Sequence, residues 1–129
     1  MRIKNKKITI VTTILWILVV FVLCAIPGDS IPDPHMNIPH LDKVVHFGMF
    51  FIMSVLWALT LEQLTEWPLK KIYLLAILIA FGYGGLIEIL QHFYFNRGGD
   101  VLDLLADVAG GIAGCLCYPF IKRLLHLEN

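Results

Sequence analysis

Four long apolar runs dominate this sequence and leave few folds open to it. They cover about 8–26, 44–61, 72–95 and 101–121, and each is close to the roughly 20 residues that a helix needs to cross a hydrocarbon core. The mean hydropathy of +0.78 and the charged fraction of 16% lie outside the range of an ordinary soluble domain. Lipid cannot satisfy open backbone groups, and the runs show no strand-like alternation. The sequence therefore predicts a single all-α domain over 1–129, an integral membrane bundle of four transmembrane helices.

The first run has a second interpretation, because a basic start followed by an apolar stretch also describes a cleaved signal peptide. A cleavage site before Cys24 would need a small residue where Leu23 stands, and no A-x-A-like site follows. We therefore expect a retained helix.

The positions of lysine and arginine predict how the helices are oriented. Basic residues gather at the N-terminus, between the second and third runs and at the C-terminus, which meet on one side after four crossings. The other side has Lys43 and Arg97. By the positive-inside rule, we expect both termini to be cytoplasmic. No basic stripe with interleaved aromatic residues is present, so a nucleic-acid partner is not expected.

The first polar motif is Asp42-Lys43-Val44-Val45-His46, at the outer start of the second run. Asp42 and His46 are four residues apart and share one helical face, and a carboxylate is favoured near a helix N-terminus. Two interpretations stay open: an interfacial cap with Lys43 among the headgroups, or part of a functional site.

The second motif places Glu88, Gln91 and His92 on one face of the third run. Gly85 extends this face inward, where we expect another helix to approach closely. Glu88 lies about 10 Å along the axis from Phe95, a depth at which an ionisable group costs several kcal/mol unless it faces the bundle interior. Glu88 is therefore a candidate for function, with a hydrogen bond that locks two helices as the alternative.

The third motif begins at Arg97 and continues with three carboxylates on one face, at i, i+3 and i+7: Asp100, Asp103 and Asp107. Gly110-x-x-x-Gly114 extends this face with a pattern typical of close packing between membrane helices. An N-cap would account for the first of these carboxylates but not for the other two. Carboxylates in lipid need a cation, a metal or shared protons.

On the expected topology all three motifs meet at the outer side, where they suit the head of an anionic amphiphile. Arg97 offers a planar fork for phosphate or carboxylate, and His46 can titrate near neutral pH. Carboxylates and imidazoles are also common ligands of divalent cations. No motif has the spacing of a known metal site, so the sequence assigns no metal ligand and leaves any cofactor unknown.

Together these residues resemble the VanZ-like family of small bacterial membrane proteins. The resemblance rests on three sets: Asp42-Lys43-x-x-His46, Glu88-x-x-Gln91, and Arg97 followed by Asp103, Asp107 and Gly111. It covers all four runs, with the motifs in the last three. The family's namesake is associated with resistance to the glycopeptide teicoplanin, so the resemblance implies a role at the cell envelope, in the bacterial cytoplasmic membrane. It implies no particular reaction.

Two positions depart from the family pattern. Phe50 stands where a tyrosine follows the histidine by four residues, so any role of a hydroxyl there is lost. Asp107 stands where an asparagine is common, which adds a charge to a position that would otherwise only form hydrogen bonds.

The leading hypothesis is that the chain binds or modifies an anionic substrate at the outer leaflet, with a membrane lipid or a lipid-linked cell-wall precursor as partner. The predicted substrate-binding residues are Arg97, Lys43, Asp42, Gln91 and Asp107. The candidates for acid–base catalysis are Glu88, Asp103 and His46. Two alternatives are an ion- or proton-coupled transporter, against which the apolar inner halves argue, and a non-catalytic membrane adaptor. The sequence does not decide whether the chain is an enzyme.

Overall fold

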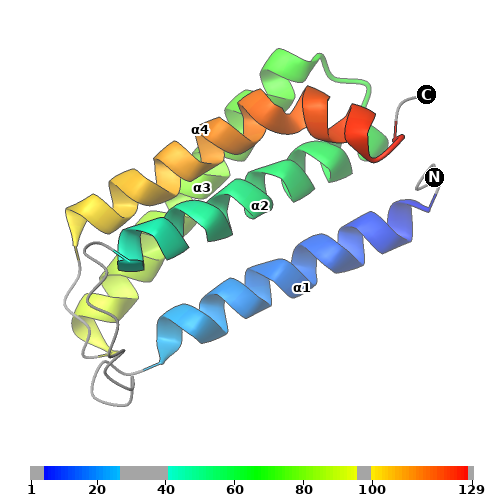
Figure 1. Ribbon diagram of the computed structural model, residues 1–129. Coiled ribbons are helices and arrows are strands. Elements are labelled where there is room, and N and C mark those ends of the chain that lie inside the picture. Colours follow the sequence, from blue (N-terminus) through cyan, green and yellow to red (C-terminus); the bar gives the residue numbers. More distant parts are fainter. Residues whose placement is uncertain (1–4, 27–40, 96–99, 128–129) are drawn as a thin grey trace.

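Four long helices lie alongside one another in the computed structural model, which describes residues 5–26, 41–95 and 100–127 (Figure 1). They are α1 (Lys6–Ala25), α2 (Leu41–Leu64), α3 (Leu69–Phe93) and α4 (Val101–Leu124). Within the described ranges there is no strand. All four helices are long and apolar enough to cross a membrane. The prediction of an all-α membrane bundle of four helices is confirmed.

The helices begin and end at other residues than the apolar runs that predicted them. α2 starts before Val44 and continues past Leu61, so Asp42 lies in its first turn. α1 and α3 also begin earlier than expected, α3 ends at Phe93 instead of residue 95, and α4 continues to Leu124. The physical reason is that an apolar run marks contact with lipid, whereas backbone hydrogen bonding continues through polar residues until a cap or a proline ends it.

α2 and α4 run in the same direction, and α1 and α3 run in the opposite direction (Figure 1). The start of α1 and the end of α4 therefore lie at one end of the bundle, which we call the terminal end. α2 and α4 both begin at the opposite end, which we call the cluster end. The assignment of the terminal end to the cytoplasm stays a prediction.

Glycines allow α2 and α4 to approach each other closely. A Cβ atom added to Gly110 would collide with the backbone carbonyl of Phe47, and one added to Gly114 would collide with Ser54 and the carbonyl of Phe51. Both collisions are with α2, so the Gly110-x-x-x-Gly114 pattern is an interface of two membrane helices, as predicted. This close contact fixes the register between α2 and α4.

α1 and α3 complete the bundle around an apolar core. Trp16 of α1 donates its indole N–H to the carbonyl of Met49, and Tyr83 of α3 donates its hydroxyl to the carbonyl of Ile17. Phe50, the position that departs from the family pattern, is fully buried in this core.

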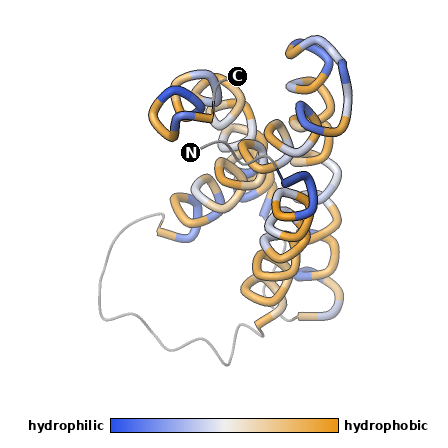
Figure 2. Tube along the Cα trace, turned by 90° about the vertical axis from the view of Figure 1, so that its right-hand side faces the viewer, coloured by the Kyte–Doolittle hydropathy of each residue, from blue (hydrophilic) through white to orange (hydrophobic). Residues whose placement is uncertain are grey.

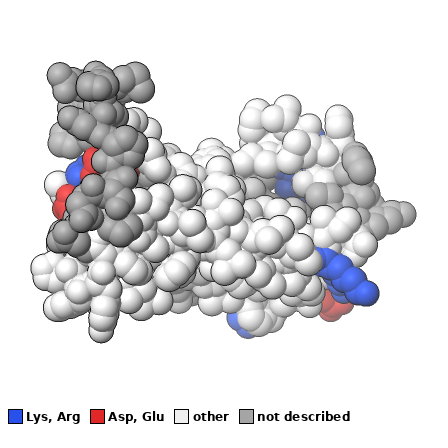
Figure 3. Space-filling model, turned by 90° about the horizontal axis from the view of Figure 1, so that it is seen from below, with Lys and Arg blue, Asp and Glu red and all other residues white. Residues whose placement is uncertain are grey.

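The outer surface of the bundle is apolar along most of its length. Large side chains such as Leu116 and Phe120 are exposed, as expected for residues that face lipid. Hydrophobic residues line most of each helix in Figure 2. On the face shown in Figure 3, a broad uncharged band separates the charged atoms at one end from those towards the other.

Candidate functional site

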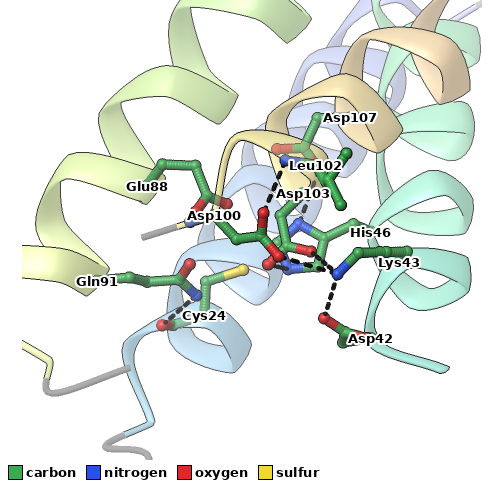
Figure 4. Close-up of polar contacts among 10 residues, drawn as sticks. All are labelled: Cys24, Asp42, Lys43, His46, Glu88, Gln91, Asp100, Leu102, Asp103 and Asp107. Atoms are coloured by element: carbon green, nitrogen blue, oxygen red, sulfur yellow. Dashed lines mark hydrogen bonds and ion pairs between the residues drawn. The ribbon is translucent and has the colours of Figure 1, made fainter. Parts of the chain in front are cut away.

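The parallel start of α2 and α4 gathers the first and third sequence motifs at the cluster end, and α3 adds Glu88 from its outer half (Figure 4). We call this group the polar cluster, and it consists of Asp42, Lys43, His46, Glu88, Asp100, Asp103 and Asp107. Two helix N-termini meet here, and their dipoles favour carboxylates in the first turns. Residues of all three motifs thus lie together at this end, although Gln91 and His92 of the second motif are not part of the polar cluster.

Lys43 joins the carboxylates of two helices. Its ammonium lies 3.1 Å from Asp42, 3.0 Å from Asp100 and 3.2 Å from Asp103. An ammonium has three N–H donors, so these contacts use its whole donor capacity. The Lys43 ammonium also holds the pKa of the Asp100 carboxyl below its ordinary value. Lys43 therefore connects the start of α2 to the start of α4.

Asp100 is the N-cap of α4, the role that its position in the sequence suggested. Its side chain accepts a hydrogen bond of 2.8 Å from the backbone N–H of Leu102 and so caps the helix. The backbone N–H of Asp100 itself donates to Glu88 at 2.9 Å. One residue thus links the N-terminus of α4 to α2 through its side chain and to α3 through its backbone.

His46 and Asp107 form a buried pair deeper in the cluster. The imidazole Nδ1 lies 2.8 Å from Asp107 Oδ1, and neither residue has appreciable exposed surface. A ring N–H at Nδ1 donates to the carboxylate in this arrangement, which fixes the orientation of the ring. The other ring nitrogen, Nε2, lies 3.9 Å from Asp103 Oδ2. His46 therefore stands between two carboxylates of α4.

α3 approaches this pair through a glycine. A Cβ atom added to Gly84 would lie 2.6 Å from Asp107 Oδ2, so only glycine leaves room for that carboxylate. The expectation that Gly85 supplies the close approach is wrong, because nothing lies within 4 Å of a Cβ atom added there. The face was misjudged by one residue, since Gly84 precedes Glu88 by four and stacks directly beneath it.

Two carboxylate oxygens of the polar cluster stay without a hydrogen-bond partner among the described residues: Glu88 Oε1 and Asp107 Oδ2. Both atoms are buried, and their side chains point towards each other's helix in Figure 4. The cluster holds five carboxylates but one ammonium and one imidazole. Uncompensated negative charge at a buried position is costly, so this region calls for protons or a further cation.

Three of the predicted substrate-binding residues are Gln91, Asp107 and Arg97. Gln91 is buried and donates its amide N–H to the carbonyl of Cys24 at 3.1 Å, which ties α3 to α1. Asp107 is fully buried, so as placed it contacts His46 rather than the surface. Arg97 lies outside the described residues.

A groove of about 210 Å³ runs beside the cluster, between the end of α3 and the start of α4. Its walls are mainly apolar, and Phe93 and Val101 are strongly exposed at its rim. Glu88, His92 and Asp100 are among the residues that line it. The groove therefore combines an apolar surface with polar groups, as a site for an amphiphile requires.

Two groups of three side chains are close enough to hold a metal ion: His46, Glu88 and Asp107, and Asp42, Asp100 and Asp103. Within each group one ligand atom per residue lies within 4.8 Å of the others. The second group surrounds the Lys43 ammonium, whereas the first has no such cation among the residues described.

The terminal end carries a further polar contact that the sequence motifs did not indicate. Glu62 of α2 accepts hydrogen bonds from Tyr118 and, at 2.7 Å, from Lys122 of α4. We call these three residues the Glu62 cluster. Its sequence signal was a single acidic residue near the end of one helix and a single basic residue near the end of another.

Comparison with protein-family models matches residues 5–122 to VanZ/LLP1. The match includes α1 to α3, α4 as far as Lys122, and every residue of the polar cluster. Neither the curated proteins nor the solved structures gave a match.

Proposed function

The chain belongs to the VanZ/LLP1 family, and on this premise we propose that it binds or modifies an anionic, lipid-linked or cell-wall-related substrate. The proposed place is the outer leaflet of the bacterial cytoplasmic membrane. The chain is a multi-pass membrane protein, so a substrate with a lipid tail can reach it from the side.

The observation that carries this proposal is the position of the polar cluster next to the apolar groove. Glu88 and Asp100 belong to both, so a molecule in the groove would meet the cluster at its polar end. Ile89 and Leu104 offer apolar contacts along the groove. An amphiphile bound here would place its head at the polar cluster and its tail along the exposed apolar side chains of the groove.

Proton transfer is the chemistry for which these side chains are suited. A carboxylate that holds Nδ1 of an imidazole directs the second nitrogen towards a reacting group, which is the logic of many acid–base sites. Here Asp107 is the positioning residue and His46 Nε2 is the proton acceptor. Asp103 and Glu88 are the other candidates for acid–base catalysis.

The anionic head needs a cationic contact, and Lys43 is the candidate among the described residues. Asp42 is the most exposed of its three partners, with 51% of its side chain accessible. An anionic head can therefore take the place of Asp42 on the ammonium with little loss elsewhere. Arg97, proposed from the sequence alone, would add a bidentate contact to phosphate or carboxylate.

The experiment that tests this proposal is identification of the lipid that purifies with the protein. Wild-type, His46→Gln and Asp103→Asn proteins are purified in mild detergent, and their lipids are extracted and compared by mass spectrometry. We expect an anionic lipid-linked species to be enriched with the wild type and reduced by about tenfold or more with both variants.

Glu66→Gln is the matched control, because Glu66 is exposed at the terminal end. It should retain the lipid of the wild type. The same lipid profile in all four proteins would contradict a substrate site at the polar cluster.

A further inference from the structure

We propose that His46, Glu88 and Asp107 bind one divalent transition-metal cation, of the Mn²⁺ or Zn²⁺ class, between α2, α3 and α4. One ligand atom from each of these residues lies within 4.8 Å of the others. The three helices each contribute one ligand, so a bound ion would join all three elements that build the polar cluster.

Two unpartnered oxygens point to a ligand at this position. Glu88 is 8% exposed and Asp107 is 0% exposed, yet Oε1 of the first and Oδ2 of the second find no hydrogen-bond partner in the described part of the chain. Buried carboxylate oxygens are almost always hydrogen-bonded or coordinated. Their other oxygens are occupied, by the backbone N–H of Asp100 and by the His46 ring, so both side chains are held in place while one oxygen of each stays free.

The proposed metal site differs in charge balance from the neighbouring group of three aspartates. Asp42, Asp100 and Asp103 already surround the Lys43 ammonium at 3.0 to 3.2 Å, so that group has its cation. The three donors of Lys43 are used by Asp42, Asp100 and Asp103, which leaves none for Glu88 or Asp107. Among the residues that the structure describes, no lysine or arginine therefore pairs with these two buried carboxylates, and His46 is the basic side chain beside them.

A divalent cation balances this charge. A neutral imidazole, two carboxylates and one M²⁺ ion give a neutral site, which is the arrangement with the smallest desolvation cost within a membrane. An imidazole ligand favours Mn²⁺ or Zn²⁺ over Mg²⁺ or Ca²⁺, which prefer oxygen ligands alone.

The three candidate ligand atoms lie within 4.8 Å of one another, so binding one ion requires the side chains to move closer together. Ligand atoms at right angles on an ion with bonds of about 2.1 Å lie about 3.0 Å apart. His46 Nδ1 and Asp107 Oδ1 are 2.8 Å apart as a hydrogen-bonded pair, so a bound ion would replace this hydrogen bond or use the unpartnered Oδ2 of the same carboxylate. With a bound ion, the ring nitrogen ligates instead of donating, and His46 and Glu88 become metal ligands rather than proton acceptors. Asp103 then stays as the acid–base candidate.

A metal ion at this position would take part in the proposed function, and the role given to it in substrate binding rests on that proposal. Three protein ligands leave coordination positions for a water molecule or for a phosphate or carboxylate oxygen. Because Glu88 also lines the groove, the ion would stand where the anionic head is proposed to bind. A site rich in carboxylates can in this way accept an anion.

The test uses the purified full chain in detergent, stripped of metal with EDTA, and Mn²⁺ as the probe. Free Mn²⁺ is measured by electron paramagnetic resonance during titration, and Zn²⁺ is added as competitor. We expect one Mn²⁺ per chain, displaced by Zn²⁺. Glu88→Gln and Asp107→Asn should each weaken binding by about tenfold or more, whereas the matched control Glu66→Gln should not change it.

A second measurement keeps the test independent of how well the variants fold. Spin-echo modulation from a coordinated imidazole nitrogen should be present in Mn²⁺-loaded wild type and absent from His46→Gln. Melting temperatures of all variants, with and without Mn²⁺, show which of them are folded. A rise on metal addition is expected for the wild type and the control.

Absence of stoichiometric Mn²⁺ and Zn²⁺ binding in the wild type would overturn the metal site, as would equal binding by Asp107→Asn and wild type. Glu88 and Asp107 would then share a proton. Lipid enrichment without metal binding would leave the proposed function standing, and metal binding without lipid enrichment would leave the metal site standing.

Discussion

The two ends of the α2–α4 pair carry polar clusters of opposite character. In the Glu62 cluster one carboxylate faces one ammonium, and each carboxylate oxygen accepts a hydrogen bond, from Tyr118 or from Lys122. In the polar cluster five carboxylates face one ammonium and one imidazole, and buried oxygens of Glu88 and Asp107 lack a partner in the described ranges. Both clusters join the same two helices.

This difference in hydrogen bonding distinguishes a polar contact that only holds two helices together from a candidate functional site. Polar groups whose hydrogen bonds are all satisfied stabilise the packing of a helix interface and need no ligand, as at Glu62. Unsatisfied buried groups destabilise the folded chain unless a ligand completes them, and natural proteins keep such groups mainly where they function. We therefore expect changes in the Glu62 cluster to lower stability, and changes in the polar cluster to affect function.

The largest effect is expected where a single change breaks both clusters. Gly110→Ala drives a Cβ atom into the carbonyl of Phe47 and forces α2 and α4 apart, so we expect a loss of roughly 2–3 kcal/mol. Thermal unfolding in detergent measures it. Gly82→Ala is the matched control, because nothing lies within 4 Å of its added Cβ, and it should be neutral or slightly stabilising. Equal melting temperatures for both variants would contradict the glycine interface.

Removing the ammonium at each end tests the charge imbalance directly. Lys43→Met leaves three carboxylates facing one another, whereas Lys122→Met leaves Glu62 with the Tyr118 hydroxyl. We expect the melting temperature to fall more for Lys43→Met than for Lys122→Met, which should lose about 1 kcal/mol. A larger loss at the terminal end would show that the polar cluster is compensated in another way.

Neutralising one carboxylate at each end should separate stability from function. Asp107→Asn keeps the shape and the acceptor for His46 and removes a buried charge, so stability should change by less than about 1 kcal/mol or rise. Glu62→Gln weakens the pair with Lys122 and should lose about 1–2 kcal/mol. Lipid co-purification should be lost in the first variant and kept in the second. The opposite pattern would make the Glu62 cluster the site.

The smallest effect concerns the exposed edge of the polar cluster. Lys43 lowers the pKa of Asp100 in the folded chain, so the stabilisation from this contact is complete above the unfolded pKa of about 3.9. It is lost as the pH falls through the lower folded value. Asp100→Asn keeps the cap but lacks this contribution. The difference in melting temperature between wild type and variant should shrink below about pH 4, and a difference that grows there would contradict the contact.

Much of the candidate site could be predicted from spacing along single helices. The i, i+4 spacing of Asp42 and His46 and the i, i+3, i+7 spacing of the α4 carboxylates correctly placed each set on one face. The N-cap at Asp100 followed from its residue type before an apolar run. Gly84 and Gly85 precede Glu88 by four and three residues, so spacing within α3 fits both, and only the position of Asp107 on α4 shows that Gly84 is the one used.

Partners across helices were beyond the reach of the sequence. The prediction that Lys43 and Gln91 bind substrate is untested, and the sequence did not indicate their partners within the protein. The structure gives Lys43 three carboxylates and Gln91 the carbonyl of Cys24. Which donor meets which acceptor depends on the rotation and register of neighbouring helices, and a hydropathy pattern contains neither quantity.

By itself the sequence determined that this chain is a bundle of four membrane helices with its polar motifs at one end, because lipid permits few backbone structures and accepts few charges. Only the tertiary structure decided that His46 pairs with Asp107 and that Lys43 is shared among three carboxylates. It also decided that Glu88 Oε1 and Asp107 Oδ2 have no hydrogen-bond partner among the described residues. The physical reason is the close parallel contact at Gly110 and Gly114, which sets the register of α2 against α4 and thereby the charge that each side chain meets.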